Sequence, residues 1–195
     1  MGEDPNLVTD LARSYVDGFQ STNTKGWGVN SVNTMIKHWP GGGTGEGGRD
    51  GHYGFGSYAV YPGDNIEEQM KIFTEGALNL RGNTLSASAI MPYYTIALGN
   101  GEGVGSAYNN YLINNILRDK YQYDGVLCTD WGITGDAFAV DVFFSGKSFG
   151  VENLTVAERH YKALMSGMDQ FGGNNDMIPV LEAFKIGVEE YGEDF

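Results

Sequence analysis

The chain has 195 residues, with 12 Lys and Arg against 25 Asp and Glu and a formal net charge of −13. This charge repels phosphate backbones and anionic lipids, and no Lys/Arg cluster interrupts it, so nucleic acid and membrane surfaces are excluded as expected partners. The single cysteine, Cys128, cannot form an internal disulfide, and three histidines are too few for a structural zinc site. An acidic N-terminus lacks the pattern of a signal peptide, and no apolar stretch reaches the roughly 18 residues of a membrane span. We therefore expect one soluble domain without a targeting signal.

Helical and strand-like patterns alternate along the chain. Apolar residues recur at helical spacing from Val8 to Phe19, which predicts an amphipathic helix. The segments that follow are a strand over 32–38, a loop over 41–64, a helix over 66–77, a strand over 85–94, a glycine-rich loop over 99–105, a helix over 108–115, a strand over 124–131, a helix over 155–164, a short strand over 167–171 and a last helix from Pro179. This alternation predicts an α/β fold with a parallel-stranded sheet.

Polar and aromatic side chains follow the predicted strands. Ligands of parallel α/β folds bind beyond the C-terminal ends of the strands, and the residues at those ends are Lys37, His38, Tyr93, Tyr94, Asp130 and Trp131. A carboxylate can attack an anomeric carbon, Lys and His can bind hydroxyls, and Trp can cover a sugar ring. The set therefore suits a neutral polyhydroxylated ligand. The alternative is structural: Asp130 caps the following segment and Trp131 belongs to the core.

The long loop contains a second pair of ionisable residues. A carboxylate at Asp50 can orient the imidazole of His52 as a general acid and base, although residues two apart can equally form an Asx turn. The same loop holds a G-x-G-x-x-G match at 43–48, but Pro40 precedes it and no apolar helix follows, so a nucleotide site is disfavoured.

Three further candidates have simpler structural interpretations. His160 lies in a predicted helix as a surface or packing residue, and Cys128 lies within a strand without a basic neighbour, so it is expected to be buried and inert. The run 174–176 (NND) could bind a metal, but it more often caps the helix that follows.

Several motifs together resemble glycoside hydrolase family 3, which includes β-glucosidases, β-xylosidases and related exo-acting enzymes. Their order and spacing extend through nearly the whole chain. The motifs are 36–43 (IKHWPGGG), 50–52 (DGH), 61–63 (YPG), 89–94 (AIMPYY) and 125–132 (GVLCTDWG).

The resemblance implies a TIM-barrel catalytic domain that hydrolyses terminal β-linked sugars with retention of configuration and needs no cofactor. Asp130 matches the family's nucleophile, which would form the covalent glycosyl-enzyme. Lys37 and His38 match the pair that binds sugar hydroxyls, and Tyr94 matches the aromatic residue near the nucleophile. Trp131 would line the same subsite. Asp50 and His52 resemble the Asp-x-His pair that one branch of the family uses as its acid/base, with a longer loop here.

A complete barrel has eight strands in about 250 residues, whereas about four strands are visible here. We therefore expect residues 1–195 to form a single partial barrel, the C-terminal half of the catalytic domain, with the upstream half and any following domain absent. Such a half leaves open sheet edges and should self-associate or bind a complementing half. Segment 133–154 is an insertion-like stretch that could form a lid or an interface. The alternative to an enzyme is a noncatalytic carbohydrate-binding or assembly module.

Overall fold

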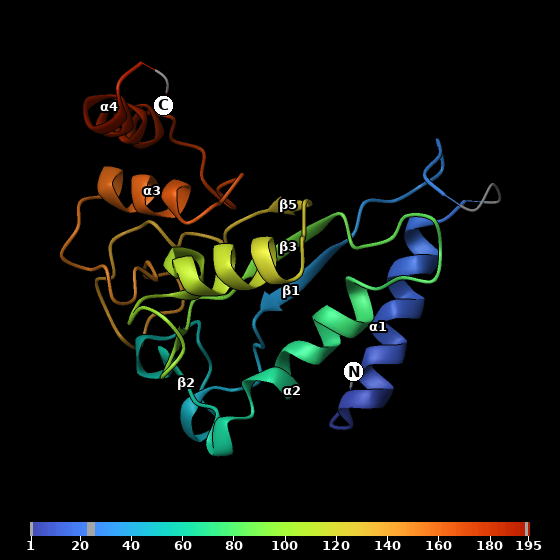
Figure 1. Ribbon diagram of the computed structural model, residues 1–195. Coiled ribbons are helices and arrows are strands. Elements are labelled where there is room, and N and C mark those ends of the chain that lie inside the picture. Colours follow the sequence, from blue (N-terminus) through green and yellow to red (C-terminus); the bar gives the residue numbers. More distant parts are fainter. Residues whose placement is uncertain (1, 23–25, 194) are drawn as a thin grey trace.

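The computed structural model describes residues 2–22, 26–193 and 195, and it shows an α/β arrangement of parallel strands and helices (Figure 1). The larger sheet contains β1 (Met35–Trp39), β3 (Ala89–Pro92) and β5 (Val126–Leu127), and the smaller one β2 (Tyr58–Ala59) and β4 (Ile96–Ala97). The helices are α1 (Pro5–Gln20), α2 (Ile66–Lys71), η4 (Ile72–Ala77), η6 (Tyr111–Lys120), α3 (Val156–Met165) and α4 (Ile178–Tyr191). Short 3₁₀ turns lie at η1 (Glu46–Gly48), η2 (Gly54–Gly56), η3 (Pro62–Asp64) and η5 (Ser106–Tyr108). The predicted α/β class is confirmed.

The larger sheet has the order β1-β3-β5, and both of its strand pairs are parallel. Met35 pairs with Ala89 and Ile90 with Leu127, so equivalent positions of the three strands lie side by side. The strand predicted over 167–171 is reduced to a single parallel bridge between Cys128 and Gln170. The strands β1, β3 and β5 are shorter than predicted, because an apolar run in the sequence does not determine how far two neighbouring backbones stay within pairing distance. The smaller sheet was not predicted, and its strand β2 lies within the segment predicted as a loop over 41–64.

The first helix shows how local sequence sets its ends and its inner face. Asp4 accepts a hydrogen bond from the Leu7 amide and so caps α1. One apolar face is buried against η4, with Val8, Ala12 and Val16 among its buried residues. A second apolar stripe stays exposed, and it comprises Leu7, Leu11, Tyr15 and Phe19.

Two predicted helices contain π-helical turns. The helix expected over 66–77 is α-helical only in α2 and continues as η4, where the Leu78 amide bonds the Phe73 carbonyl. The helix expected over 108–115 is η6, which ends with a bond from the Tyr121 amide to the Ile116 carbonyl. Both hydrogen bonds join residues five positions apart, as in a π-helix. A spacing of apolar residues near 3.6 per turn does not distinguish such turns from α-helical ones.

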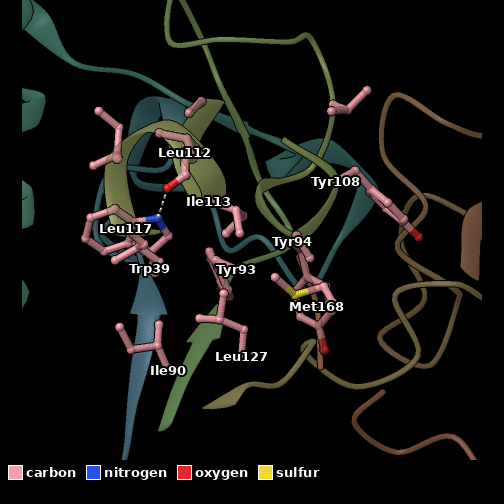
Figure 2. Packing of buried hydrophobic residues seen from close by; sticks show 14 of the residues in the cluster. Trp39, Ile90, Tyr93, Tyr94, Tyr108, Leu112, Ile113, Leu117, Leu127 and Met168 are labelled. Carbon is pink, nitrogen blue, oxygen red and sulfur yellow. Dashed lines mark hydrogen bonds between the residues drawn. The ribbon is translucent and has the colours of Figure 1, made fainter. Parts of the chain in front are cut away.

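The core lies between the sheet and η6 (Figure 2). Trp39 at the end of β1 is fully buried, and its indole nitrogen donates to the Leu112 carbonyl at 3.2 Å. The ring of Phe73 meets it edge-on at 5.4 Å. These contacts fix the C-terminal end of β1, which is the end that carries Lys37 and His38.

The larger sheet does not close into a barrel within the described residues. There β1 pairs only with β3, and a cavity of about 770 Å³ lies beside β1 and α1. The helices α1 and α4 lie at opposite ends of the molecule (Figure 1). Within the described part of the chain, no helix combines the length and apolar character needed to cross a membrane.

Candidate active site

The C-terminal ends of β1, β3 and β5 bring together three residues that are far apart in sequence. His38 lies on β1, Tyr94 follows β3, and Asp130 follows β5. The backbone keeps the strand ends in register beyond the strands: the Tyr93 amide donates to the Trp39 carbonyl at 2.9 Å, and the Cys128 amide to the Ile90 carbonyl at 3.0 Å. The predicted meeting of polar residues at the strand ends is therefore present in the structure.

The Asp130 carboxylate has two unlike oxygens. Its Oδ1 accepts hydrogen bonds from the Trp131 amide at 2.6 Å and from the Tyr94 hydroxyl at 2.8 Å. Its Oδ2 is buried and makes no hydrogen bond. The Nε2 atom of His38 lies 3.2 Å from Oδ2, close enough for electrostatic attraction but outside hydrogen-bonding geometry. One oxygen is thus held in place while the other keeps its lone pairs free.

Tyr94 and His38, beside Asp130, favour their uncharged forms at ordinary pH. Burial and the Asp130 charge raise the pKa of Tyr94 far above its usual value, so its hydroxyl keeps its proton. Burial lowers the pKa of His38; Asp130 acts in the opposite direction, and the Lys37 ammonium adds to the lowering. The imidazole of His38 therefore favours its uncharged form.

Asp50 and His52 form a second hydrogen-bonded unit. Asp50 Oδ1 lies 2.7 Å from His52 Nδ1, and it accepts from the His52 amide at 3.0 Å and the Tyr93 hydroxyl at 3.2 Å. Burial alone would raise the pKa of Asp50, but the hydrogen bonds from His52 and Tyr93 outweigh it, so the pKa lies below the ordinary value. The Asx turn and the oriented imidazole, two alternatives from sequence, occur together.

The two units meet at Tyr94. The His52 ring lies edge-on to the Tyr94 ring with centroids 5.3 Å apart, while the Tyr94 hydroxyl bonds Asp130. Because Nδ1 of His52 faces the Asp50 carboxylate, that nitrogen is assigned the proton, and Nε2 is left to exchange a proton with a ligand.

Lys37 and Trp131 stand at the margin of this group. Lys37 is exposed and forms no hydrogen bond or ion pair within the described ranges. Trp131 is 64% exposed, so the interpretation of Trp131 as a core residue is wrong. Its ring lies so close to Gly173 that a Cβ there would fall 2.6 Å from a ring carbon. Asp130 caps the following segment only in the sense that its Oδ1 accepts a hydrogen bond from the Trp131 amide. No helix begins directly after Asp130.

Sequence reasoning missed Lys147 and the role of Phe143. The Phe143 ring stacks on His52 at 5.0 Å with an interplanar angle of 10°, and Lys147 Nζ lies 5.5 Å from the centroids of both the Phe143 and Tyr94 rings. Burial lowers the pKa of Lys147 below its ordinary value, and the opposing effect of the Asp130 and Asp50 charges does not cancel this lowering. The only signal in the sequence was the apolar character of segment 133–154, which does not reveal what it covers.

The remaining candidates are structural. His160 is buried, not at the surface, and bonds the Val156 carbonyl and the Asn174 amide group. Cys128 is buried and its pKa is raised by burial and then by Asp130, as expected for an inert thiol. The Asp176 carboxylate accepts from the Ile178 amide at the start of α4, which supports the capping interpretation of 174–176.

Neither a metal nor a nucleotide is supported by this geometry. Across the described ranges, no cluster of three or more His, Cys, Asp or Glu side chains could hold a metal ion. The glycine-rich match at 43–48 contains the short turn η1 and is followed by an irregular loop, and no long helix begins there.

The chain matches the family model described as "Glycosyl hydrolase family 3 N terminal domain" over residues 1–188. It is 35% identical over 188 residues to a probable β-glucosidase C of Aspergillus oryzae, covering 96% of this chain and 28% of that protein. It is 37% identical over 202 residues to a periplasmic β-glucosidase/β-xylosidase of Dickeya chrysanthemi, covering 95% of this chain and 30% of that protein. The chain therefore spans less than a third of the length of these relatives.

Solved structures show the same fold. An exo-1,3/1,4-β-glucanase from a Pseudoalteromonas species superposes with a TM-score of 0.71 at 16% identity, covering 98% of this chain and 27% of that one. A β-glucosidase involved in saponin metabolism from intestinal bacteria superposes with a TM-score of 0.65 at 22% identity, covering 99% and 23%. The expectation of a C-terminal half is corrected by the family match, which places these residues in an N-terminal domain.

Proposed function

The chain belongs to glycoside hydrolase family 3, and from that premise we propose that its residues carry out the hydrolysis of terminal β-linked sugars with retention of configuration. The substrate is a β-linked oligosaccharide or glycoside, and neither a cofactor, a nucleic acid nor a membrane takes part. The single observation that carries the proposal is the free, buried Oδ2 of Asp130 beside an otherwise fully bonded Oδ1.

Asp130 is the nucleophile in this proposal. Its Oδ2 attacks the anomeric carbon, the bond to the leaving oxygen breaks, and a glycosyl ester forms. The donors on Oδ1 hold the carboxylate in one orientation, so the attacking oxygen does not have to give up a hydrogen bond before it reacts. In the second step water attacks the same carbon and Asp130 leaves as the carboxylate.

His52, oriented by Asp50, is the acid/base. Its Nε2 gives a proton to the leaving oxygen in the first step and takes one from water in the second. The 2.7 Å contact between Asp50 Oδ1 and His52 Nδ1 supports this role, because it fixes the ring and stabilises the imidazolium that donates the first proton and that the second proton transfer restores.

The sugar is bound by residues around Asp130. Lys37 and His38 bind its hydroxyls, Tyr94 supports the nucleophile, and the exposed Trp131 covers one face of the ring. The exposure of Lys37 and Trp131 suits this role, since both side chains are open to solvent beside the site.

Residues 1–195 act as a single partial barrel within a longer catalytic domain. The open β1 edge and the exposed apolar stripe of α1 support this, because both resemble surfaces that another strand and helix would cover. The chain alone would then self-associate or bind a complementing barrel half, and alone it could be inactive.

A noncatalytic carbohydrate-binding or assembly module is the second candidate function. It is favoured by the incomplete barrel, in which the described residues leave the sheet open beside the site. Such a module would keep Trp131 and His38 as sugar contacts and would have no use for the free oxygen of Asp130.

Release of an aryl leaving group from a panel of aryl β-glycosides tests the proposal. Wild-type protein, D130N and H52Q are compared, and the anomeric configuration of the first-formed sugar is followed by NMR. Catalysis predicts a loss of at least about a thousandfold in D130N, and about a hundredfold or more in H52Q for a leaving group that needs protonation. Sugar binding by a well-folded wild type without turnover would favour the module, whereas equal activity in D130N would reject Asp130 as the nucleophile.

A further inference from the structure

The loop after β5 runs beside the segment 170–174. The Thr129 amide donates to the Gln170 carbonyl at 2.9 Å, and the Gly172 amide donates to the Thr129 hydroxyl oxygen at 2.9 Å. A Cβ at Gly172 would lie only 2.2 Å from the Thr129 carbonyl oxygen, so the two backbones are in direct contact. The loop after β5 is therefore anchored to this segment one residue before Asp130.

The Trp131 ring lies against the same segment. Gly173 has a φ of +65°, and a Cβ there would fall 2.6 Å and 2.9 Å from two carbons of the six-membered ring of Trp131. Only glycine therefore fits at position 173 while the ring keeps this place. Trp131 is nevertheless 64% exposed, so the ring is supported by Gly173 and remains open to a ligand.

His160 on α3 contacts both the loop after β5 and the segment 170–174. It is 1% exposed, and its Nε2 lies 2.9 Å from the Asn174 side-chain nitrogen and 3.3 Å from the Thr134 hydroxyl oxygen. Its Nδ1 lies 2.7 Å from the Val156 carbonyl oxygen, which can only accept, so Nδ1 carries the proton and Nε2 accepts. One buried imidazole thus connects the two segments through hydrogen bonds of defined direction.

The contact between Trp131 and Gly173 lies between two cross-links of the same pair of segments. On one side is the hydrogen bond between Gly172 and Thr129, and on the other are the two contacts of His160. If either cross-link were lost, the segments could separate and the ring would lose its support. The orientation of an exposed side chain therefore depends on a buried one.

We propose that His160 and Gly173 are positioning residues that hold the Trp131 ring where it can cover a bound sugar. The inference rests on the proposed function in one respect, namely that Trp131 contacts the sugar. Neither His160 nor Gly173 contacts the sugar itself, and both act through Trp131. A ring that is already ordered loses little conformational entropy when the sugar binds, so more of its contact energy contributes to affinity.

The order of the Trp131 ring can be measured without any ligand. The indole N–H signal of Trp131, assigned by its loss in W131F, is followed by ¹⁵N relaxation in wild type, H160F, H160Q and G173A. H160F keeps an aromatic ring but removes both nitrogens, whereas H160Q keeps a donor and an acceptor. We expect the heteronuclear NOE of the indole to fall in H160F and G173A and to stay at the wild-type value in H160Q.

Sugar affinity is then measured on the same variants by calorimetry with methyl 1-thio-β-glucoside and methyl 1-thio-β-xyloside. H160F and G173A are expected to weaken binding about threefold to tenfold, as W131A does, while H160Q binds like wild type. In the W131A background neither substitution should weaken binding further, because the ring through which both act is absent. An equal further loss in that background would show a merely structural effect and overturn the proposal.

G63A is the matched control for G173A. Gly63 has a φ of +68°, close to the +65° of Gly173, but a Cβ there would meet no atom within 4 Å. Both variants carry similar backbone strain, so only G173A should change the indole signal and the sugar affinity. If H160F does not fold, the comparison of G173A with G63A decides alone. Equal effects of the two glycine variants, or an ordered indole and wild-type affinity in G173A, would overturn the proposal.

The outcome is separable from that of the proposed function. A covalent sugar adduct on Asp130 together with unchanged affinities in H160F and G173A would leave the hydrolase proposal standing and reject the positioning role. Conversely, a loss of affinity in both variants that disappears in the W131A background, in a protein that forms no adduct, would support the positioning role and reject Asp130 as nucleophile. No binding of either thioglycoside, or wild-type affinity in W131A, would reject both the sugar contact of Trp131 and this inference.

Discussion

The hydroxyl of Tyr94 gives the sharpest single test of how Asp130 works. Its oxygen lies 2.8 Å from Asp130 Oδ1 and 2.8 Å from the Trp131 carbonyl, and its one proton can serve only one of them at a time. Tyr94 is 3% exposed, so water cannot readily take its place. Y94F therefore removes a donor from the carboxylate and leaves Oδ1 with the Trp131 amide alone.

The expected effect falls mainly on the second chemical step. A hydrogen bond to a charged group contributes about 1.5–3 kcal/mol. That bond is strongest when Asp130 is a full carboxylate and weaker when it is a glycosyl ester. Breakdown of the ester regenerates the carboxylate without its Tyr94 donor, so this step should slow by about tenfold to a hundredfold. Because the ester then accumulates, KM should fall together with kcat.

Stopped-flow release of an aryl leaving group measures both steps in Y94F. We expect a burst equal to the enzyme concentration followed by a slow steady state, with full wild-type secondary structure by circular dichroism as the folding control. A Y94F enzyme with unchanged kcat and KM, or one that loses the burst itself while remaining folded, would refute this reasoning about the hydrogen bond.

Four further predictions concern stability and binding. D50N should keep the fold and lose turnover by about a hundredfold. Hydrogen bonding lowers the folded-state pKa of Asp50 below 3.8, so the stabilising effect of its carboxylate is present above that value and is lost as pH falls through the folded pKa. Melting curves of wild type and D50N should therefore converge only below about pH 4. Burial lowers the pKa of His160 below 6.5, so the unfolded state binds the proton more readily and wild-type stability should fall as pH drops below about 6.5, whereas H160Q should show less of this decline in a series of thermal melts. R159M leaves several buried carbonyls unbonded and should lower the free energy of unfolding by about 3 kcal/mol in urea titrations, against no change for K185M on the outer surface of α4. W131A should weaken glycoside affinity about threefold to tenfold with an unchanged melting temperature, because the ring is 64% exposed; a large loss of stability would contradict its assignment to the sugar.

Sequence patterns were sufficient for the fold class and for much of the site. Alternating elements predicted parallel strands, and the rule that ligands bind at strand ends brought His38, Tyr94 and Asp130 into one place. The Asp50–His52 contact was also within reach, because residues two apart in a loop can share one turn and one hydrogen bond. These features depend on short-range geometry or on topology that a linear pattern encodes.

Other features depend on long-range packing that no local pattern encodes. The strands are shorter than their apolar runs because pairing ends where the backbones diverge, as β5 shows with two residues. His160 is buried through partners from three separate segments, Val156, Thr134 and Asn174, which its helical position alone does not reveal. Lys147 could not be selected as a site residue, since only the folded chain places its ammonium beside Phe143 and Tyr94.

The proposed mechanism depends most directly on a covalent bond between Asp130 and the sugar. Incubation with 2-deoxy-2-fluoro glycosides carrying a good leaving group, followed by intact mass measurement and peptide mapping, tests it directly. We expect one added sugar per chain, located on the peptide that contains Asp130, and no adduct in D130N with an unchanged fold. An adduct on another residue, or an adduct that persists in D130N, would contradict it.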